Sequence, residues 1–318
     1  MAAEDLVTAT RALAKIKVAY EILPGVFDPD AALMPGAPVL HDYAADNLVK
    51  HIPIRKGDVE AGFAAADVII GECFETQQVE HAYLEPEAGL AYVDPDGVVT
   101  VHSPSQNITD PPSKTTTHPR HMLSDILALP INKVRMIMSP VGGGFGGKED
   151  MIYQGMLALL AMKTGQPVRL VFTREESVST TAKRHPARIS YRMGLARDGR
   201  ITASEIRAVY DGGAYGMSTE GGIRQGAILA GGPYAIPNVK IDTYGVYTNN
   251  TPSGAFRSFG SLQTQFATES MLDMAAERLG LDPFELRRRN AMRAGDTTHT
   301  QQRLDSASLL DVLAGAEG

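Results

Sequence analysis

A stretch of ten residues near the middle of the chain has a composition suited to holding a ligand. It runs from Val141 to Asp150, reads VGGGFGGKED, and has five glycines in six consecutive positions; we call it the glycine loop. Without Cβ atoms the backbone can adopt positive φ angles and approach a ligand closely. Apolar residues predict a strand at 134–138 and, at helical spacing, a helix at 151–163. A strand, a glycine turn and a helix N-terminus together favour an anionic or oxo-bearing ligand.

The spacing of the glycines also permits a nucleotide site. Residues 142–147 match the G-x-G-x-x-G pattern of dinucleotide-binding proteins. That pattern requires an acidic residue about 20 positions later, and Glu175 and Glu176 come too late. A phosphate-binding P-loop requires Ser or Thr after its lysine, where this chain has Glu149. A nucleotide-binding enzyme and a purely structural glycine turn therefore stay open as alternatives.

The elements around the glycine loop predict a mixed α+β fold. Turn residues predict two β-hairpins, at 90–102 and at 186–210. Apolar patterning adds strands at 16–21, 68–76, 168–173 and 239–248, helices at 4–14, 59–65, 119–129 and 262–279, and leaves a flexible glycine-rich segment at 211–222. The strands on either side of the glycine loop and its helix would form a βαβ unit. Asp282 and Pro283 predict the start of a further helix. This irregular alternation indicates mixed sheets with helices rather than a doubly wound parallel sheet.

Composition and charge narrow the function. The 318 residues carry a net charge of −7, which argues against nucleic acid or an anionic membrane as the main partner. Cys73 is the only cysteine, so the chain alone can form no disulfide and no cysteine-ligated iron–sulfur or zinc site. Its place in a strand pattern predicts that it is buried. No apolar run reaches the length of a membrane span and the first residues lack a signal peptide's pattern, so we expect a cytoplasmic protein.

Residues 142–149 resemble the GGGFGGKE signature of the xanthine dehydrogenase/aldehyde oxidase family, in its molybdenum-cofactor-binding large subunit. Five further stretches match that family in the same order: 80–86, 105–107, 184–186, 255–260 and 286–290. The resemblance covers residues 4–313, and it is to the first half of that subunit only. It implies the fold of that family's molybdopterin-binding domain.

The resemblance implies a molybdenum–molybdopterin cofactor, with the cytosine dinucleotide form as one candidate. In that family the cofactor hydroxylates an electron-poor carbon, and water rather than O₂ supplies the oxygen. The Gln106 amide would donate a hydrogen bond to a molybdenum oxo group, and Phe145 would lie near the same group. No side chain of this chain would bind the metal directly. The other residues implied at the cofactor are Gly143, Gly144, Gly146 and Arg257.

The same resemblance places two residues against the substrate. Phe259 matches a substrate-facing aromatic residue, and Glu149 matches a carboxylate that binds the heterocycle in xanthine-type members. Glu149 therefore favours an N-heteroaromatic substrate over an aldehyde. The family has glycine where this chain has Ser258, so the path of the loop is open at that residue.

The resemblance also implies domains and partner chains. It divides the chain into the tail of a small N-terminal α/β hammerhead-like domain (1–30), a connecting segment (31–57) and the first molybdenum-cofactor-binding domain (58–318). A partner half would carry the glutamate that acts as general base. Separate iron–sulfur and FAD subunits would carry electrons away. An inactive, cofactor-free scaffold or assembly module is a further alternative to this function.

Overall fold

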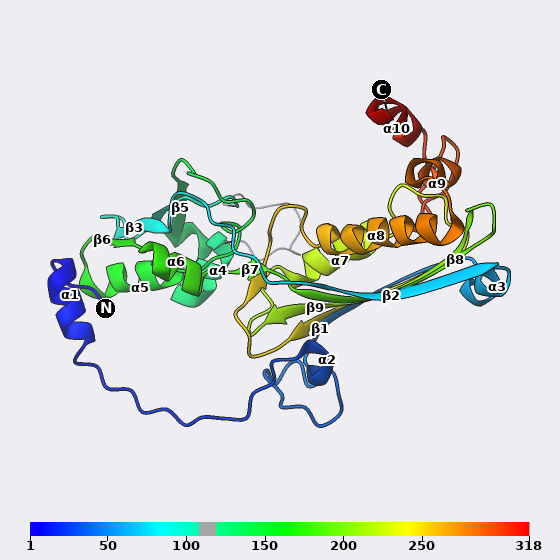
Figure 1. The fold of residues 1–318 in the computed structure, drawn as a ribbon. Helices are drawn as coiled ribbons and strands as arrows, with labels where there is room; N and C mark the ends of the chain where they lie inside the picture. The colour runs from blue at the N-terminus through cyan, green and yellow to red at the C-terminus, as the bar shows by residue number, and fades with distance from the viewer. Residues whose placement is uncertain (108–118, 318) are drawn as a thin grey trace. The chain divides into compact units, whose positions relative to one another are not determined.

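The computed structural model describes residues 1–107 and 119–317 (Figure 1). The chain folds into two compact units. Unit 1 comprises Met1–Pro24 and Glu80–Ala182, and unit 2 comprises Gly25–Val79 and Lys183–Gly318. The glycine loop therefore belongs to unit 1, whereas the matched stretch at 255–260 belongs to unit 2.

A four-stranded sheet in the order β5-β4-β3-β6 forms the base of unit 1. Its strands are β3 (Ala88–Val93), β4 (Val99–Ser103), β5 (Val134–Met138) and β6 (Val168–Val171). β3 and β4 are antiparallel, which confirms the first predicted hairpin, while β4 and β5 are parallel and β3 and β6 antiparallel. β5 and β6 therefore run in the same direction, with β4 and β3 between them. The two strands of the predicted βαβ unit are parallel but are not neighbours in the sheet.

Helices pack on this sheet and bury its apolar residues. They are α4 (Pro119–Leu127), the 3₁₀ helix η1 (Ile131–Lys133), α5 (Gln154–Thr164) and α6 (Arg174–Thr180). Ala91 and Val101 of the sheet share a fully buried cluster with Leu123 of α4 and Leu157 of α5. Each buried aliphatic side chain of this size stabilises the fold by about 1.5–3 kcal/mol. This cluster holds α5, and with it the end of the glycine loop, on the sheet.

The N-terminal segment begins with α1 (Leu6–Leu13), which confirms the predicted first helix. The strand predicted at 16–21 is wrong, because these residues form no strand and Tyr20 is 83% exposed. A strand requires the backbone N–H and C=O groups of a neighbouring strand, and none of the described residues supplies them here.

A five-stranded sheet in the order β1-β10-β9-β8-β2 is the centre of unit 2. Its strands are β1 (Leu48–Lys56), β2 (Val68–Thr76), β8 (Ala187–Leu195), β9 (Ile201–Gly213) and β10 (Val239–Tyr247). All neighbours are antiparallel except β9 and β10. β8 and β9 confirm the second predicted hairpin, whereas the weak periodicity of residues 31–57 gives no signal for β1. Because both sheets mix parallel and antiparallel pairs, the predicted mixed α+β fold is confirmed.

Helices lie on both faces of this second sheet. They are α2 (Pro29–Ala32), α3 (Val59–Ala64), α7 (Thr219–Leu229), α8 (Ser261–Leu279), α9 (Pro283–Asn290) and α10 (Leu309–Glu317). α7 and α8 cover one face and α2 lies against the other (Figure 1). Two short strands, β7 (Lys183–Arg184) and β11 (Ser253–Gly254), pair in parallel beside the sheet. Within residues 1–107 and 119–317, no helix is long and apolar enough to cross a membrane.

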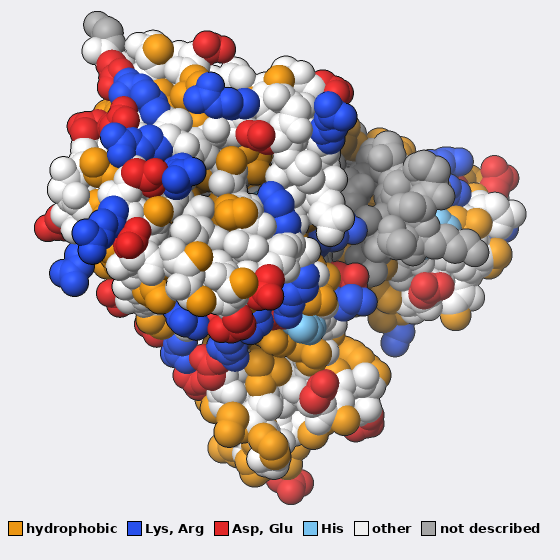
Figure 2. All heavy atoms as spheres, turned by 90° about the vertical axis from the view of Figure 1, so that its right-hand side faces the viewer, with side chains coloured by type: hydrophobic (Ala, Val, Ile, Leu, Met, Phe, Trp, Pro, Cys, Tyr) orange, Lys and Arg blue, Asp and Glu red, His pale blue; other side chains and the backbone are white. Residues whose placement is uncertain are grey.

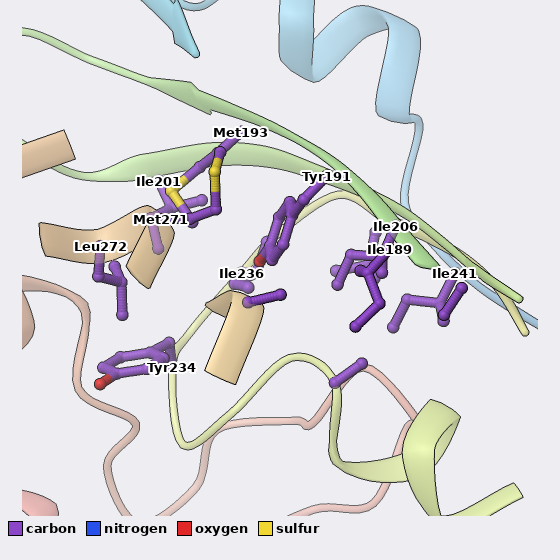
Figure 3. Packing of buried hydrophobic residues seen from close by; sticks show 14 of the residues in the cluster. Ile189, Tyr191, Met193, Ile201, Ile206, Tyr234, Ile236, Ile241, Met271 and Leu272 are labelled. Carbon is purple, nitrogen blue, oxygen red and sulfur yellow. The ribbon is translucent and has the colours of Figure 1, made fainter. Parts of the chain in front are cut away.

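The main core of unit 2 lies between the sheet and α8 (Figure 3). Ile189, Tyr191 and Met193 alternate along β8 and are fully buried, as expected for one face of a strand. Met271 and Leu272 of α8 are buried in the same cluster. The core therefore fixes α8 and the loop that leads into it.

The predicted burial of Cys73 is wrong, because the residue is exposed. β2 is an edge strand, and its burial alternates along the chain. Ile70 and Phe74 face the core, while Cys73 lies on the opposite face of the strand with Ile69. The strand prediction is right, but the local sequence does not show which face of the strand is buried.

α9 starts where the sequence predicts. The Asp282 carboxylate accepts hydrogen bonds from the N–H groups of Phe284 (2.9 Å) and Glu285 (3.0 Å). Each arginine at 287–289 then pairs with at least one acidic side chain. Figure 2 views the molecule from the side on which α8 and α9 lie, and basic and acidic side chains are interspersed there. The arginines thus form an ion-paired helix surface.

α7 begins inside the segment at 211–222 that the sequence predicts to be flexible, so that prediction is wrong at 219–222. The glycines of this helix permit close packing. A Cβ on Gly226 would lie 2.3 Å from the hydroxyl oxygen of Tyr210. Tyr210 is fully buried, and its hydroxyl donates to the carbonyl of Gly260 at 2.8 Å. Glycine is needed at 226 for close approach rather than for flexibility.

We expect Gly226→Ala to destabilise unit 2, although alanine favours a helix over glycine by about 1 kcal/mol. The added methyl group overlaps the Tyr210 hydroxyl, and such overpacking costs about 1–3 kcal/mol. Urea unfolding measures the change. Gly222→Ala in the same helix is the matched control, since its Cβ would meet only His185 at an ordinary 3.5 Å. Equal stability of the two variants would contradict the packing argument.

Candidate functional site

The glycine loop lies between β5 and α5 and has a strained backbone. Gly143 and Gly146 have φ angles of +94° and +103°, and Phe145 between them has +54°. Residues other than glycine enter this left-handed region at a cost of about 1–2 kcal/mol. A Cβ on Gly144 would lie 2.2 Å from Oε1 of Gln106. Conformation therefore requires glycine at 143 and 146, and the approach of Gln106 requires it at 144.

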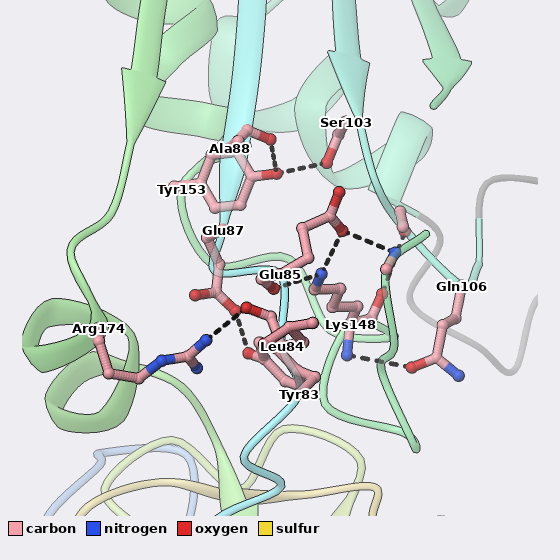
Figure 4. Close-up of polar contacts among 12 residues, drawn as sticks. Tyr83, Leu84, Glu85, Glu87, Ala88, Ser103, Gln106, Lys148, Tyr153 and Arg174 are labelled. Atoms are coloured by element: carbon pink, nitrogen blue, oxygen red, sulfur yellow. Dashed lines mark hydrogen bonds and ion pairs between the residues drawn. The ribbon is translucent and has the colours of Figure 1, made fainter. Parts of the chain in front are cut away.

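Gln106 follows β4 and is fixed against the loop (Figure 4). Its backbone N–H donates to the carbonyl of Lys148 at 2.9 Å. Its side-chain Oε1 accepts from the N–H groups of Gly146 (2.9 Å) and Lys148 (3.3 Å). Two N–H donors require the carbonyl end of the amide, so the NH₂ end is directed away from them. That NH₂ group has no acceptor among the described residues and the side chain is exposed, so it is available to a ligand.

An ion pair between the buried ammonium of Lys148 and the partly exposed carboxylate of Glu85 fixes the glycine loop (Figure 4). Nζ of Lys148 donates to Oε2 (2.6 Å) and to the backbone carbonyl (2.8 Å) of Glu85, and lies 4.6 Å from the centre of the Tyr83 ring. Oε2 of Glu85 also accepts from the N–H of Gly142 at 2.9 Å. Burial raises the pKa of Glu85, but the hydrogen bonds from Lys148 and Gly142 outweigh it, so this pKa is lowered overall. Both ends of the glycine-rich turn are thereby tied to Glu85.

The segment at 80–87, which carries Glu85, is itself held by unit 1 (Figure 4). The Tyr83 hydroxyl donates to Glu87, and burial together with this carboxylate raises the pKa of Tyr83. Arg174 of α6 donates to the carbonyl of Leu84 at 2.6 Å. Sequence reasoning missed the role of Glu85 and Lys148, although both lie inside matched stretches. Their contact spans 63 positions of sequence, which no local pattern reports.

α5 does not begin where the sequence predicts. It starts at Gln154 rather than at 151, so the prediction that a helix N-terminus adjoins the glycines is wrong. Oε1 of Gln154 accepts from the N–H groups of Ile152 (2.8 Å) and Tyr153 (3.1 Å). The N–H groups of residues 143–145, by contrast, have no acceptor among the described residues. Successive backbone donors in such a turn can bind an anionic or oxo group, so the loop itself provides these donors.

Glu149 follows directly and is half-buried. Burial raises the pKa of its carboxyl group. The carboxyl has no hydrogen-bond or ion-pair partner among the residues that the structure describes. A half-buried carboxyl group without a partner is available to a substrate.

Unit 2 carries the other two predicted site residues. Arg257 is exposed, and Phe259 is half-buried, with its ring 2.8 Å from where a Cβ on Gly221 would lie. Ser258, Phe259 and Gly260 are left-handed in succession, with φ angles of +73°, +40° and +88°. Glycine adopts this conformation most easily, which is a physical reason for the glycine that the resemblance implies at 258.

Unit 1 thus brings together Gln106, the glycine loop and Glu149, while Arg257 and Phe259 lie on one loop of unit 2. The assignment of these residues to a cofactor and a substrate stays a prediction. Among the described residues, no group of three or more His, Cys, Asp or Glu side chains could hold a metal ion.

The sequence from residue 40 to residue 291 matches the family described as molybdopterin cofactor-binding domain. The chain belongs to this family. It is 37% identical over 306 residues to the nicotinate dehydrogenase large molybdopterin subunit of Eubacterium barkeri, which covers 96% of this chain and 70% of that protein. It is also 33% identical over 320 residues to the xanthine dehydrogenase molybdenum-binding subunit of Escherichia coli O157:H7, over 98% of this chain and 40% of that protein.

Solved structures agree with this membership. The aldehyde oxidoreductase of Desulfovibrio gigas matches with a TM-score of 0.91 and 32% identity, covering 99% of this chain and 34% of that one. The resemblance to large molybdenum-binding subunits of xanthine dehydrogenases and aldehyde oxidoreductases is therefore confirmed. This chain spans less than half of the Escherichia and Desulfovibrio proteins.

We expect removal of either partner of the ion pair to destabilise unit 1, but unequally. Glu85→Ala leaves an ammonium group that is 3% exposed without a counter-ion, which should cost about 3 kcal/mol. Lys148→Met leaves a carboxylate that is 36% exposed and that water can reach, so the loss should be about 1–2 kcal/mol. Urea unfolding at neutral pH measures both. Arg135→Ala, which breaks an exposed pair with Asp94, is the control with a loss below about 1 kcal/mol.

We expect Glu149→Gln to raise the stability of unit 1 at neutral pH by about 0.5 kcal/mol, the size of a modest single-residue effect. The raised pKa means that the folded state holds the proton more tightly than the unfolded chain, so the charged carboxylate opposes folding. The gain should therefore vanish below about pH 4 and grow as the pH rises above the unfolded value. Urea unfolding between pH 3 and 8 tests this. Glu175→Gln, at an exposed position of α6, is the control. If the stability difference between Glu149→Gln and the wild type did not change with pH, the raised pKa of Glu149 would be refuted.

Proposed function

We propose that this chain is the part of a molybdenum-cofactor hydroxylase or dehydrogenase that holds one side of the cofactor. The enzyme would oxidise an N-heteroaromatic or aldehyde substrate with oxygen from water. When bound, the molybdenum–molybdopterin group supplies the two-electron oxidation. Relatives whose names specify nicotinate and xanthine, both N-heteroaromatic compounds, support the first substrate class.

The free amide end of Gln106 is the observation that carries this proposal. The loop uses the carbonyl end of the side chain and leaves two N–H donors exposed beside it. A neutral amide can donate to a metal-bound oxo ligand without competing for the metal. The N–H groups of residues 143–145, which have no acceptor among the described residues, add donors on the same loop. This donor set fits an oxo-bearing group held against a glycine-lined wall.

The other predicted residues have roles that match their surroundings. Phe145 is 52% exposed despite its strained backbone, so its ring can pack against the cofactor. Glu149 would bind the heterocycle through its half-buried carboxyl group. Phe259 would stack on the substrate, and the exposed guanidinium of Arg257 would lie beside the cofactor. In this proposal the chain binds and orients the cofactor and the substrate, and the general base comes from the partner half.

Completion of the reaction would require partner chains. A partner half would carry the catalytic glutamate, and iron–sulfur and FAD subunits would take the electrons. The division of the chain at residues 30 and 57, the cytosine dinucleotide form of the cofactor and a cytoplasmic location belong to the same proposal.

Molybdenum and pterin analysis of the purified, assembled complex tests the proposal directly. We expect about one molybdenum per copy of this chain. A complex that contains neither molybdenum nor pterin would favour a cofactor-free scaffold instead. Calorimetric titration with NAD and ATP tests the nucleotide alternative, and we expect no binding.

We expect Gln106→Leu to lower kcat/KM by about 10²–10³-fold while the fold is retained, because one preorganised donor at the reacting group is lost. The loss should appear in kcat rather than in KM alone. Steady-state kinetics of the assembled complex measures it, with molybdenum content determined in parallel. Gln166→Leu, at an exposed position after α5, is the matched control and should keep full activity. Full activity of Gln106→Leu would contradict the role of the amide.

A further inference from the structure

Arg184 on β7 is a buried cation that has no acidic partner among the described residues. The residue is only 9% exposed. The guanidinium lies over the ring of Phe256, 4.0 Å from its centre, and Nη1 donates to the carbonyl of Arg257 at 3.1 Å. Burial lowers the pKa of Arg184. Its charge is therefore taken out of water and directed at two neighbouring residues, Phe256 and Arg257.

Such a group is a poor choice for stabilising a fold. A guanidinium has five N–H donors, and burying it without a counter-ion costs free energy that one hydrogen bond and one cation–π contact offset only in part. An apolar side chain of similar length would be neutral or stabilising at this place. The role of Arg184 must therefore lie in what its two contacts position.

Both contacts are on the loop at 256–260, which contains Arg257 and Phe259. Three of its residues are left-handed in succession, and two of these, Ser258 and Phe259, are not glycine. A residue other than glycine is unfavourable in this conformation, so the loop keeps this path only if its surroundings impose it. The hydrogen bonds that impose this path are accepted by nearly every backbone carbonyl of the loop.

Four carbonyls of the loop have assigned donors. Phe256 O accepts from the N–H of Phe259 (2.7 Å), Arg257 O from Arg184 (3.1 Å), Ser258 O from the N–H (3.0 Å) and hydroxyl (2.5 Å) of Ser261, and Gly260 O from the hydroxyl of Tyr210 (2.8 Å). Of these five donors, only Arg184 is a charged side chain, and it also stacks on the loop. Arg184 holds the first half of the loop, whereas Tyr210 holds its end.

The backbone that carries Arg184 is fixed by several contacts. Its strand pairs with β11, where residue 184 lies opposite Gly254. The next residue, His185, is fully buried, with a pKa lowered to about 3 by burial and by the neighbouring Arg184 charge, so it stays neutral. Its ring contacts the Thr219 hydroxyl at 2.8 Å, and its carbonyl accepts from Gln263 at 2.9 Å. The strand is thereby anchored to both α7 and α8.

We propose that Arg184 is a positioning residue: it fixes the strained loop at 256–260 and, through that loop, the places of Arg257 and Phe259. The inference rests on the proposed function for those two side chains. Arginine suits this role because one planar group can stack on an aromatic ring and donate from its edge at the same time. Lysine can do only one of these in a given geometry.

Arg184→Met and Arg184→Lys in the assembled complex test the proposal. For Arg184→Met we expect kcat/KM to fall about 100-fold, the effect of a small misplacement at a reaction site, with molybdenum content unchanged. The melting temperature should stay the same or rise, because an unpaired buried charge has been removed. Arg184→Lys should recover about tenfold of the lost activity.

A second readout is independent of activity. Hydrogen exchange in peptides that cover residues 256–261 should speed up by at least tenfold in Arg184→Met, because the bonds of Phe259 N–H and Ser261 N–H open more often. Arg192→Met is the matched control. Arg192 of β8 stacks on Phe63 at 4.4 Å but pairs with Glu205, and neither contact is on the loop at 256–260. It should change neither activity nor exchange at 256–261.

Two outcomes for Arg184→Met overturn the inference, and one outcome for the wild-type complex overturns the proposed function instead. Wild-type kcat/KM and exchange in Arg184→Met would show that the loop does not need the guanidinium. A melting temperature lowered by more than about 5 °C, or failure to fold, would show an ordinary structural role, since that shift corresponds to about 1 kcal/mol or more. If the wild-type complex lacks molybdenum and turnover, the proposed function fails instead. Hydrogen exchange then still decides whether Arg184 positions the loop.

Discussion

The glycine loop depends on one ion pair, between the buried ammonium of Lys148 and the partly exposed carboxylate of Glu85. Ordering a residue costs about 1–2 kcal/mol, and glycine costs most, so a turn with five glycines does not hold its shape by itself. Lys148 supplies what the glycines lack. Its ammonium binds Glu85 twice, its backbone carbonyl accepts from Gln106, and its N–H donates back to the Gln106 side chain. The residue that anchors the loop therefore also orients the amide.

These contacts of Lys148 explain how the glycine loop keeps a strained backbone. The described part of the chain has eight residues other than glycine with positive φ, and four of them lie in the matched stretches: Ala82, Phe145, Ser258 and Phe259. Strain of this kind persists where the surroundings impose it, and it is common where a ligand is bound. In unit 1 the surroundings are the ion pair between Lys148 and Glu85. In unit 2 they are the hydrogen bonds that the carbonyls of the loop at 256–260 accept. In both units, strained residues lie next to the groups that the proposed function places against a ligand.

Local patterns predict most of the fold but not these long-range contacts. Both hairpins, the strand before the glycine loop and the cap of α9 follow from turn residues and periodicity. β1 is missed because residues 31–57 have no clear period, and α7 is missed because glycine predicts freedom where it provides close packing. The strand at 16–21 fails for the opposite reason: the pattern is present, but no neighbouring strand is found among the described residues. Motif order identifies Gln106 and Glu149 as candidate site residues, yet only the structure shows that Glu85 and Lys148 hold the loop beside them.

Each unit fixes one loop, the glycine loop or the loop at 256–260, through a buried cation that lies over an aromatic ring. The two cations differ in whether they have an acidic partner. In each, a buried cation lies over an aromatic ring and donates to a backbone carbonyl near left-handed residues: Lys148 over Tyr83, and Arg184 over Phe256. Lys148 has a carboxylate partner, so its charge contributes to stability as well as to position. Arg184 has none among the described residues, so its burial opposes folding. A side chain whose charge destabilises the fold and whose contacts fix a strained loop acts mainly on the geometry of that loop.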